Sequence, residues 1–289
     1  MKSKRHFSAL LFLSTPVSSQ LNKLFYPGFK DLNSNITLRR EAKIKKSGIL
    51  CLTNDTSYLP GQAFYSSPIQ FKNSTNGQVF SFSTSFALVI VPEYPELGGQ
   101  GLAFTISTSK DLKGFPSQYL GLFGNVKNFS NHLFAVEFDT VQSNNVESQE
   151  LYDMQGNNVG IAINSLNSNV SSTAAYFDDS STKQNFNLKS RKPILAWIDY
   201  DASENLLNVT ISPHSSKPRL PLLSFNVNLS PIFHEFMYIG FSSATGMLAS
   251  SHYILGWSFK INGEARALDL VSLPPIPDKK KQTGLLICL

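Results

Sequence analysis

Two carboxylates stand two residues apart in a short, mostly apolar run near the middle of the 289-residue chain. The run Val136–Val141 contains Glu137 and Asp139, and Val159–Ile161 resumes the apolar pattern after a polar loop. This order predicts a strand, an acidic loop and a second strand. Residues two apart on a strand share a face, so the two carboxylates repel each other unless a cation lies between them.

The loop offers further oxygen donors that suit a divalent cation. The donors are the carboxylate of Asp153 and the side-chain amides of Asn144, Asn145, Asn157 and Asn158. Two interpretations stay open from the spacing alone. The segment is either a metal-binding loop or a solvated acidic hairpin.

Five stretches carry a resemblance to a known family. They are Ser117–Asp139, Phe25–Phe29, Gly98–Ser107, Ala196–Asp201 and Met237–Gly263. Together they resemble the legume-type (L-type) lectin domain, and most of all the extracellular domain of plant L-type lectin receptor kinases. The resemblance runs through residues 21–272 in the order of the family.

The resemblance implies roles for the residues of the acidic loop. Glu137 corresponds to a transition-metal ligand, and Asp139 to a carboxylate that bridges a transition metal and calcium. Val141 would give calcium a backbone carbonyl, and Asp153 would be the second bridging carboxylate. Calcium takes 6–8 oxygen ligands, and its main role here would be to fix the loop against the sugar.

The metal loop departs from the family pattern in two ways. The loop from Gln142 to Tyr152 is longer, and Ser143 stands where the family has an Asn or Asp ligand. Asn144, Asn145 or Glu147 could replace that ligand. Asn158 stands where a histidine completes the transition-metal site, and an amide oxygen is a poor substitute for imidazole. Calcium is therefore the expected cofactor, and manganese is expected to bind poorly.

The expected carbohydrate site also departs from the family. Gln100, before Gly101, replaces an Asp, and a neutral amide cannot make charge-assisted bonds to a sugar. Asn144 is a candidate sugar contact, and the loop with Gly246 and Met247 would shape specificity. We expect glycan binding that is weak or altered in specificity. The alternative is a recognition ectodomain that binds a peptide, an apolar ligand or a partner receptor instead of sugar.

The remaining pattern predicts an all-β fold. In Phe80–Ile90, large apolar residues alternate with small ones, and Tyr253, Leu255, Trp257 and Phe259 are expected to share one face. Leu207 and Val209 alternate with Asn208, which should point outward. Many short strands without a helical period favour an antiparallel β-sandwich. The resemblance narrows this to the legume-lectin (concanavalin A-like) jelly roll.

The ends of the chain indicate secretion. Residues 1–20 are interpreted as a signal peptide, 21–272 as the lectin domain, and 273–289 as a Pro/Lys-rich tail with an incomplete start of a membrane helix. A span needs about 20 apolar residues. We expect a secreted, extracellular chain, or a plasma-membrane one if a longer product carries a full helix.

Seven N-x-S/T sequons support an extracellular glycoprotein. They begin at Asn35, Asn54, Asn73, Asn128, Asn169, Asn208 and Asn228. Without the lysines and arginine near the two ends, the body is close to neutral, so nucleic acid is not an expected partner. Glycans are, and a membrane receptor or a lectin-domain dimer is a further candidate.

An enzyme is not expected. A jelly-roll glycosidase would need a third acid after Glu137 and Asp139, but Thr140, Val141 and Gln142 follow. Cys51 and Cys288 are the only cysteines, and their positions disfavour a disulfide.

Overall fold

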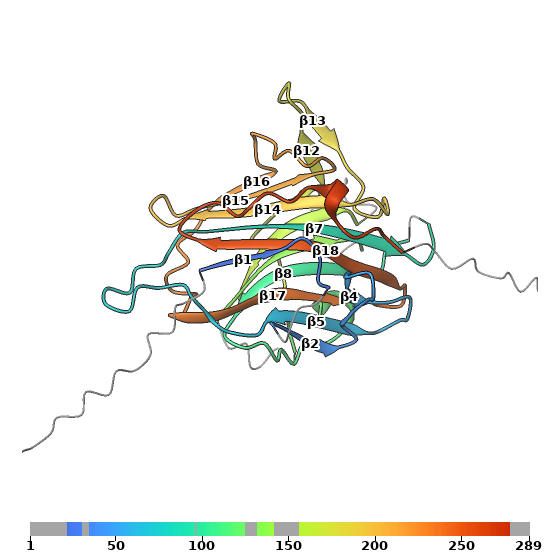
Figure 1. The fold of residues 1–289 in the computed structure, drawn as a ribbon, viewed down its shortest axis with the longest axis horizontal. Helices are drawn as coiled ribbons and strands as arrows, with labels where there is room; N and C mark the ends of the chain where they lie inside the picture. The colour runs from blue at the N-terminus through green and yellow to red at the C-terminus, as the bar shows by residue number, and fades with distance from the viewer. Residues whose placement is uncertain (1–21, 31–34, 96, 125–131, 142–155, 278–289) are drawn as a thin grey trace, which may run out of the picture.

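The computed structural model describes residues 22–30, 35–95, 97–124, 132–141 and 156–277. Two large antiparallel sheets pack face to face, and a small hairpin projects beside them (Figure 1). The helical elements are short 3-10 turns, η1 (Ser117–Tyr119) and η3 (Leu270–Ser272). The prediction of an all-β antiparallel sandwich is confirmed. Within the described part of the chain, no helix is long and apolar enough to cross a membrane.

The first sheet, here called the back sheet, has β7 and β18 at its centre. Its strands lie in the order β16 (Leu223–Asn226), β15 (Leu206–Ser212), β14 (Ile194–Asp201), β7 (Phe82–Pro92), β18 (Ser250–Ile261), β4 (Leu50–Thr53) and β3 (Lys43–Ile44), and β1 (Lys23–Tyr26) also pairs with β18.

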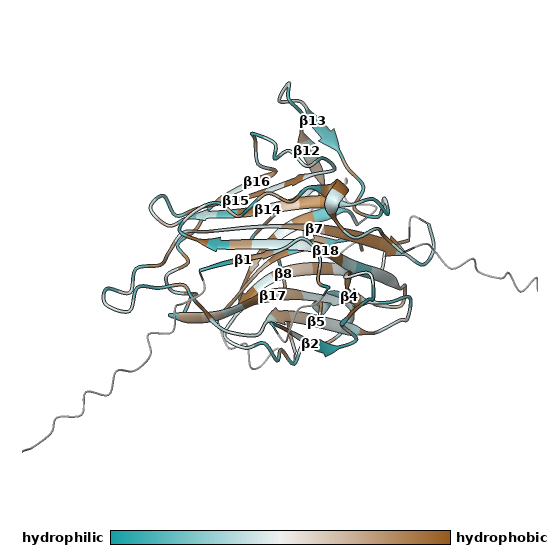
Figure 2. Ribbon diagram, in the orientation of Figure 1, coloured by the Kyte–Doolittle hydropathy of each residue, from teal (hydrophilic) through white to brown (hydrophobic). Residues whose placement is uncertain are grey.

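The second sheet, here called the front sheet, contains the acidic strand β9. Its order is β11 (Val170–Thr173), β10 (Asn158–Ile163), β9 (Leu133–Asp139), β8 (Gly101–Ser107), β17 (Phe236–Ala244), β5 (Pro60–Tyr65) and β2 (Ile36–Arg40), with β6 (Ile69–Gln70) also paired to β17. The separate hairpin consists of β12 (Ala175–Phe177) and β13 (Lys183–Asn185). Hydrophobic colour lies along parts of β7 and β14, whereas β13 is largely hydrophilic (Figure 2).

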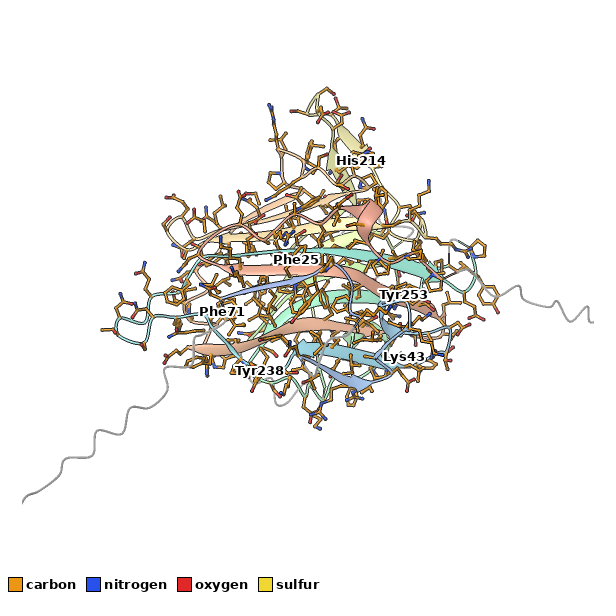
Figure 3. All side chains as sticks on the ribbon, viewed as in Figure 1. Phe25, Lys43, Phe71, His214, Tyr238 and Tyr253 are labelled. Atoms are coloured by element: carbon orange, nitrogen blue, oxygen red, sulfur yellow. The ribbon has the colours of Figure 1, made fainter. Side chains whose placement is uncertain are left out.

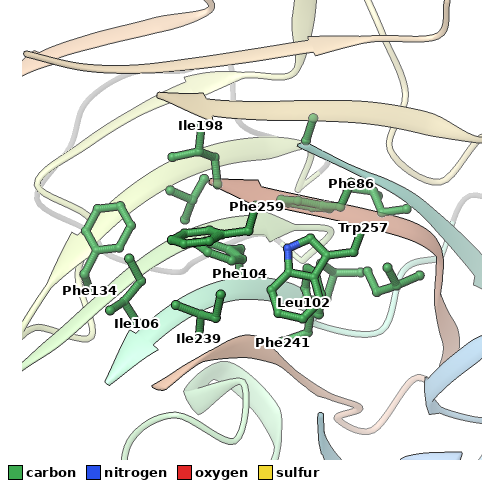
Figure 4. Close-up of a cluster of buried hydrophobic side chains, with 14 of the residues drawn as sticks. Phe86, Leu102, Phe104, Ile106, Phe134, Ile198, Ile239, Phe241, Trp257 and Phe259 are labelled. Carbon is green, nitrogen blue, oxygen red and sulfur yellow. The ribbon is translucent and has the colours of Figure 1, made fainter. Parts of the chain in front are cut away.

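Aromatic rings from both sheets form the core between them. Phe86 of β7 lies 5.0 Å from Phe241 of β17, and Phe241 lies 5.0 Å from Trp257 of β18, measured between ring centres (Figure 4). The Trp257 indole donates a hydrogen bond of 3.0 Å to Thr84 Oγ1, which satisfies its buried N–H. Edge-to-face pairs of this kind add about 0.5–1.5 kcal/mol beyond burial of their area. The predicted alternation of β7 is confirmed, since Phe82 and Phe86 both join this core.

Strand β18 differs from the prediction that Tyr253, Leu255, Trp257 and Phe259 share one face. Trp257 and Phe259 point into the core, but Tyr253 and Leu255 belong to a cluster on the outer face of the back sheet. The cause is a β-bulge: Leu88 pairs with Ile254 and Ala87 with Gly256, which leaves Leu255 as the extra residue. One extra residue shifts the alternation, so every later side chain changes face.

The chain after β18 folds back over this outer cluster. The cluster contains Ile49, Cys51, Ala87, Val89, Leu195, Trp197, Tyr253, Leu255, Leu268 and Leu273, and Ile276 packs against it. The guanidinium of Arg266 lies 3.9 Å from the centre of the Phe25 ring, and Figure 3 labels Phe25 and Tyr253. Cys51 is a buried free thiol that donates to the Thr53 carbonyl over 3.1 Å. Cys288 lies outside the described residues.

The packing of this C-terminal segment yields a direct prediction. Leu273 is 7% exposed and Val271, two residues earlier, is 92% exposed. Leu273→Ala should lower the free energy of unfolding by about 2–5 kcal/mol, because it leaves a cavity over the outer cluster. Val271→Ala is the matched control and should change it by less than about 0.5 kcal/mol. Urea denaturation of both variants measures the difference. Equal, small effects would mean that the segment does not stabilise the domain.

Candidate functional site

The ends of three neighbouring strands bring the predicted site residues together. Gly101 of β8 pairs with Asp139 of β9, and Asp139 pairs with Asn158 of β10. Directly paired residues of a sheet share a face. Phe138 and Val159, the neighbours in sequence, point into the core. Gly101, Asp139 and Asn158 therefore form a row on the outer face of the front sheet.

Glu137 lies one row further along the same face. It pairs with Ala103 and with Gly160. The Ser168 hydroxyl donates to Glu137 Oε2 over 3.1 Å. Gly160 makes this contact possible, because a Cβ there would lie 2.3 Å from Ser168 Oγ. Sequence reasoning missed Ser168, and the glycine that faces the carboxylate is the only local signal for it.

The environment of Glu137 favours the protonated acid. The pKa of Glu137 is raised to about 8, chiefly by burial; the Ser168 hydrogen bond lowers it, and the nearby Asp139 carboxylate raises it. A cation beside the two carboxylates would act in the opposite direction, since an adjacent positive charge favours the ionised form.

The backbone after β9 is fastened to the loop that carries Gln100. The Thr140 N–H donates to the Gln100 carbonyl over 2.7 Å, and the Val141 N–H donates to Asp139 Oδ1 over 2.9 Å. Val141 thus lies beside the Asp139 carboxylate, and a calcium-binding role for its carbonyl stays a prediction. The other predicted loop ligands, Ser143, Asn144 and Asp153, lie outside the described residues, as do the alternatives Asn145 and Glu147.

The expected sugar-binding loops meet at the same end of the front sheet. Gln100 adopts a left-handed backbone conformation with φ of 31°. Its side chain lies against Gly246, where a Cβ would come within 2.7 Å of Gln100 Nε2. Met247 is 78% exposed beside it. The Tyr58 N–H donates to the Gly246 carbonyl over 3.0 Å, and the Tyr58 side chain is 55% exposed. Tyr58, like Met247, is an exposed side chain at the edge of these loops, and the sequence analysis did not predict it.

The donor chemistry of the described part of this site suits calcium. It consists of the carboxylates of Glu137 and Asp139 and the amide of Asn158, all of which offer oxygen. Within the described ranges, no group of three or more His, Cys, Asp or Glu residues is arranged to hold a metal. Among the described residues, Asn158 offers an amide oxygen at the position where the family resemblance predicts the histidine of a transition-metal site.

His132 and His252, for which the sequence suggests structural roles, lie outside the candidate site. His252 is fully buried, and its Nδ1 lies 2.6 Å from Thr53 Oγ1. Burial lowers the pKa of His252 to about 3, so its imidazole is neutral in the folded protein. His132 Nδ1 lies 2.8 Å from the Ile232 carbonyl. Both interactions stabilise the sandwich.

The sequons fall into three groups by exposure. Asn35, Asn169 and Asn228 are exposed, whereas Asn54, Asn73 and Asn208 are partly buried. Asn128 lies outside the described residues. Asn208 is on the face opposite the buried Leu207 and Val209, as predicted.

Comparison with known proteins identifies the family to which nearly the whole chain is similar. Residues 22–275 match the family described as the legume lectin domain. The chain is 47% identical over 283 residues to the L-type lectin-domain containing receptor kinase V.9 of Arabidopsis thaliana, which covers 96% of this chain and 41% of that protein. The chain thus spans about two fifths of the length of this relative.

Solved lectins share the fold. The metal-free form of lectin I-B4 from Griffonia simplicifolia superposes with a TM-score of 0.68 at 27% identity, and covers 83% of this chain and 99% of its own. The basic winged bean lectin with Tn-antigen gives a TM-score of 0.67 at 27% identity, with the same coverage. These matches confirm the jelly roll, and legume lectin domains are non-enzymatic carbohydrate-binding domains. The chain therefore belongs to the legume lectin family.

Proposed function

We propose that this domain recognises glycans outside the cell, at a calcium-ordered site on the end of the front sheet. The observation that carries the proposal is the row Gly101, Asp139 and Asn158, with Gln100 held to the backbone just after Asp139. In this row, oxygen donors that could bind a cation lie next to the loop of Gln100, which would face the sugar. The match to a plant L-type lectin-domain containing receptor kinase and the similarity to the basic winged bean lectin, whose structure is with Tn-antigen, support this assignment.

Each residue has a defined part in this proposal. Asp139 would hold calcium together with Val141 and the loop residues Ser143, Asn144 and Asp153, and calcium would fix the order of that loop. Gln100 would donate and accept hydrogen bonds to sugar hydroxyls, with Gly246 leaving room for its amide. Met247 would pack on the apolar side of the sugar ring.

The neutral Gln100 limits the affinity that this site can reach. A charge-assisted hydrogen bond is about twice as strong as a neutral one. Glycan binding is therefore weaker than with a carboxylate, or directed to a different glycan.

A second candidate function is recognition of a peptide or another apolar ligand. It rests on exposed apolar side chains beside the sugar loops, namely Tyr58, Leu97, Phe115 and Met247. The Ser117 N–H donates to the Thr245 carbonyl over 3.0 Å, which ties the Phe115 loop to the loop of Gly246. Contiguous exposed apolar surface marks interaction sites.

The proposed location follows from the proposed processing. Residues 1–20 would be removed as a signal peptide, and residues 273–289, whose first part packs on the outer cluster through Leu273 and Ile276, would form the Pro/Lys-rich tail. A partner receptor or a second lectin domain would then act at the cell surface.

Glycan binding is tested on an array, with and without chelator. Gln100→Ala should lower binding because it removes the Gln100 amide that would face the proposed sugar, and Gln100→Asp should raise binding by about 1 kcal/mol, since hydrogen bonds to charged groups contribute more. Gln78→Ala changes an exposed glutamine in a distant turn and is the control. Glycan binding that is unchanged by chelator and by both Gln100 variants would favour the second candidate function, recognition of a peptide or an apolar ligand.

Calcium binding is tested through thermal stability. Calcium at about 100 times its Kd should stabilise the chelator-treated protein by about 2.7 kcal/mol. Asp139→Asn should abolish this gain because it removes the central carboxylate, whereas Asp179→Asn, at an exposed position, should keep it. Differential scanning calorimetry measures both. If the wild type gains no stability from calcium, the loop is not a calcium site.

The pH dependence of the metal-free protein tests the environment of Glu137. The folded-state pKa of about 8 lies above the ordinary glutamate pKa of 4.5 that applies to the unfolded chain. Between these values the folded protein keeps a proton that the unfolded chain releases, so stability falls as pH rises through this window. Glu137→Gln should flatten this fall and raise Tm at pH 8 in chelator, because an amide has no proton to lose.

Glu204→Gln, at an exposed turn position, is the control and should leave the pH profile unchanged. Tm measured across the window in chelator gives the slope for each variant. A slope that is the same in Glu137→Gln and wild type would contradict the assignment of the buried proton to Glu137.

A further inference from the structure

A cleft of about 380 Å³ opens on the outer face of the back sheet, away from the residues of the candidate sugar site. Its floor is a row across three strands, in which Ser83 of β7 pairs with Asp199 of β14 and Asp199 pairs with Asn208 of β15. Lys217 and Arg219, from the chain between β15 and β16, line its wall. The volume is within the range of about 300–1,000 Å³ that small-ligand sites occupy.

Most polar groups of the floor are already paired. Ser83 Oγ donates to Asp199 Oδ1 over 2.7 Å, and Lys217 Nζ forms an ion pair with Asp199 Oδ2 over 2.7 Å. Asn208 is the exception, because its Oδ1 is buried without a hydrogen-bond partner among the described residues. A buried, unpartnered amide oxygen costs about 1–3 kcal/mol, and the described residues of the floor do not hold the Asn208 amide in place through it.

Asn208 and Thr210 are the first and third residues of a sequon, and both line the cleft. We propose that Asn208 is N-glycosylated and that the first N-acetylglucosamine of the glycan lies inside this cleft. In the transfer, a bond forms between Asn208 Nδ2 and C1 of the sugar. The glycosidic bond to a lipid diphosphate donor breaks, the lipid diphosphate leaves, and Nδ2 gives up one proton.

The cleft offers the contacts that a sugar ring requires. The Lys217 ammonium and the Asp199 carboxylate present hydrogen-bonding groups at one side, and Pro218 and Pro221 present apolar surface. The attachment atom is on the floor, so the first ring lies between these walls instead of extending into solvent. The glycan then covers the polar end of the outer face of the back sheet.

Asn228 provides a contrast within the same chain. It is exposed, and its Oδ1 accepts a hydrogen bond of 2.9 Å from the Ser230 N–H, so its amide is already satisfied locally. It does not line the cleft. A glycan on Asn228 would be free in solvent, which makes this sequon the matched control.

The test uses the chain secreted from cultured insect cells, with site occupancy and glycan release followed by mass spectrometry. Peptide-N-glycosidase is added to the native and to the denatured protein. A glycan held in a cleft is released only after local opening, so release from native Asn208 should be at least ~10-fold slower than from exposed sequons such as Asn228. After denaturation the rates should agree. The double change Lys217→Ala and Arg219→Ala opens the wall and should reduce the difference.

A stability measurement complements the release rates. Asn208→Gln should lower the Tm of the glycosylated protein more than Asn228→Gln does. In protein made in bacteria, which lacks the glycan, the excess effect of Asn208→Gln should disappear. An unmodified Asn208 in the secreted protein overturns the proposal. Release from native Asn208 as fast as from the exposed sequons overturns it too.

Discussion

The candidate site depends on the desolvation of a carboxylate next to a second carboxylate. Glu137 and Asp139 share one face of β9, and burial holds the pKa of Glu137 at about 8. The domain can satisfy this arrangement by a proton on Glu137 or by a cation beside the pair. The Ser168 hydrogen bond favours the ionised carboxylate, but burial outweighs it in the metal-free protein.

The sandwich core sets the geometry of this pair. Phe138 anchors β9 between the sheets, 5.7 Å from Phe86 across the core, and thereby fixes which residues of β9 face outward. The register with β8 and β10 then brings Gly101 and Asn158 to either side of Asp139. A shift of one residue would turn both carboxylates into the core, where unpaired charges are strongly unfavourable. The packing of the core therefore also fixes the geometry of the candidate site.

Alternation of apolar and polar residues in the sequence predicted which side chains of the strands face the core. The inward face of β7 and the outward position of Asn208 both followed from alternation, and so did the shared face of Glu137 and Asp139. The bulge at Leu255 was missed, because a bulge depends on how two strands fit and leaves only Gly256 as a local sign. The Ser168 contact was missed because it joins residues that are far apart in the sequence.

The packing of Leu268 and Leu273 on the back sheet was also beyond sequence reasoning. These residues lie in an irregular segment, where hydrophobic spacing has no strand or helix period to identify a buried face. The loop ligands Ser143, Asn144 and Asp153 stay predictions, as do the sugar contacts.

The central proposal is that this site binds calcium and does not bind manganese. Elemental analysis of the purified protein, after dialysis against metal-free buffer, tests it most directly. The account predicts calcium in equimolar amount with the chain and no bound manganese, because Asn158 stands where the family resemblance predicts the histidine of the manganese site. Manganese in equimolar amount with calcium, or a chain that retains neither metal, would contradict it.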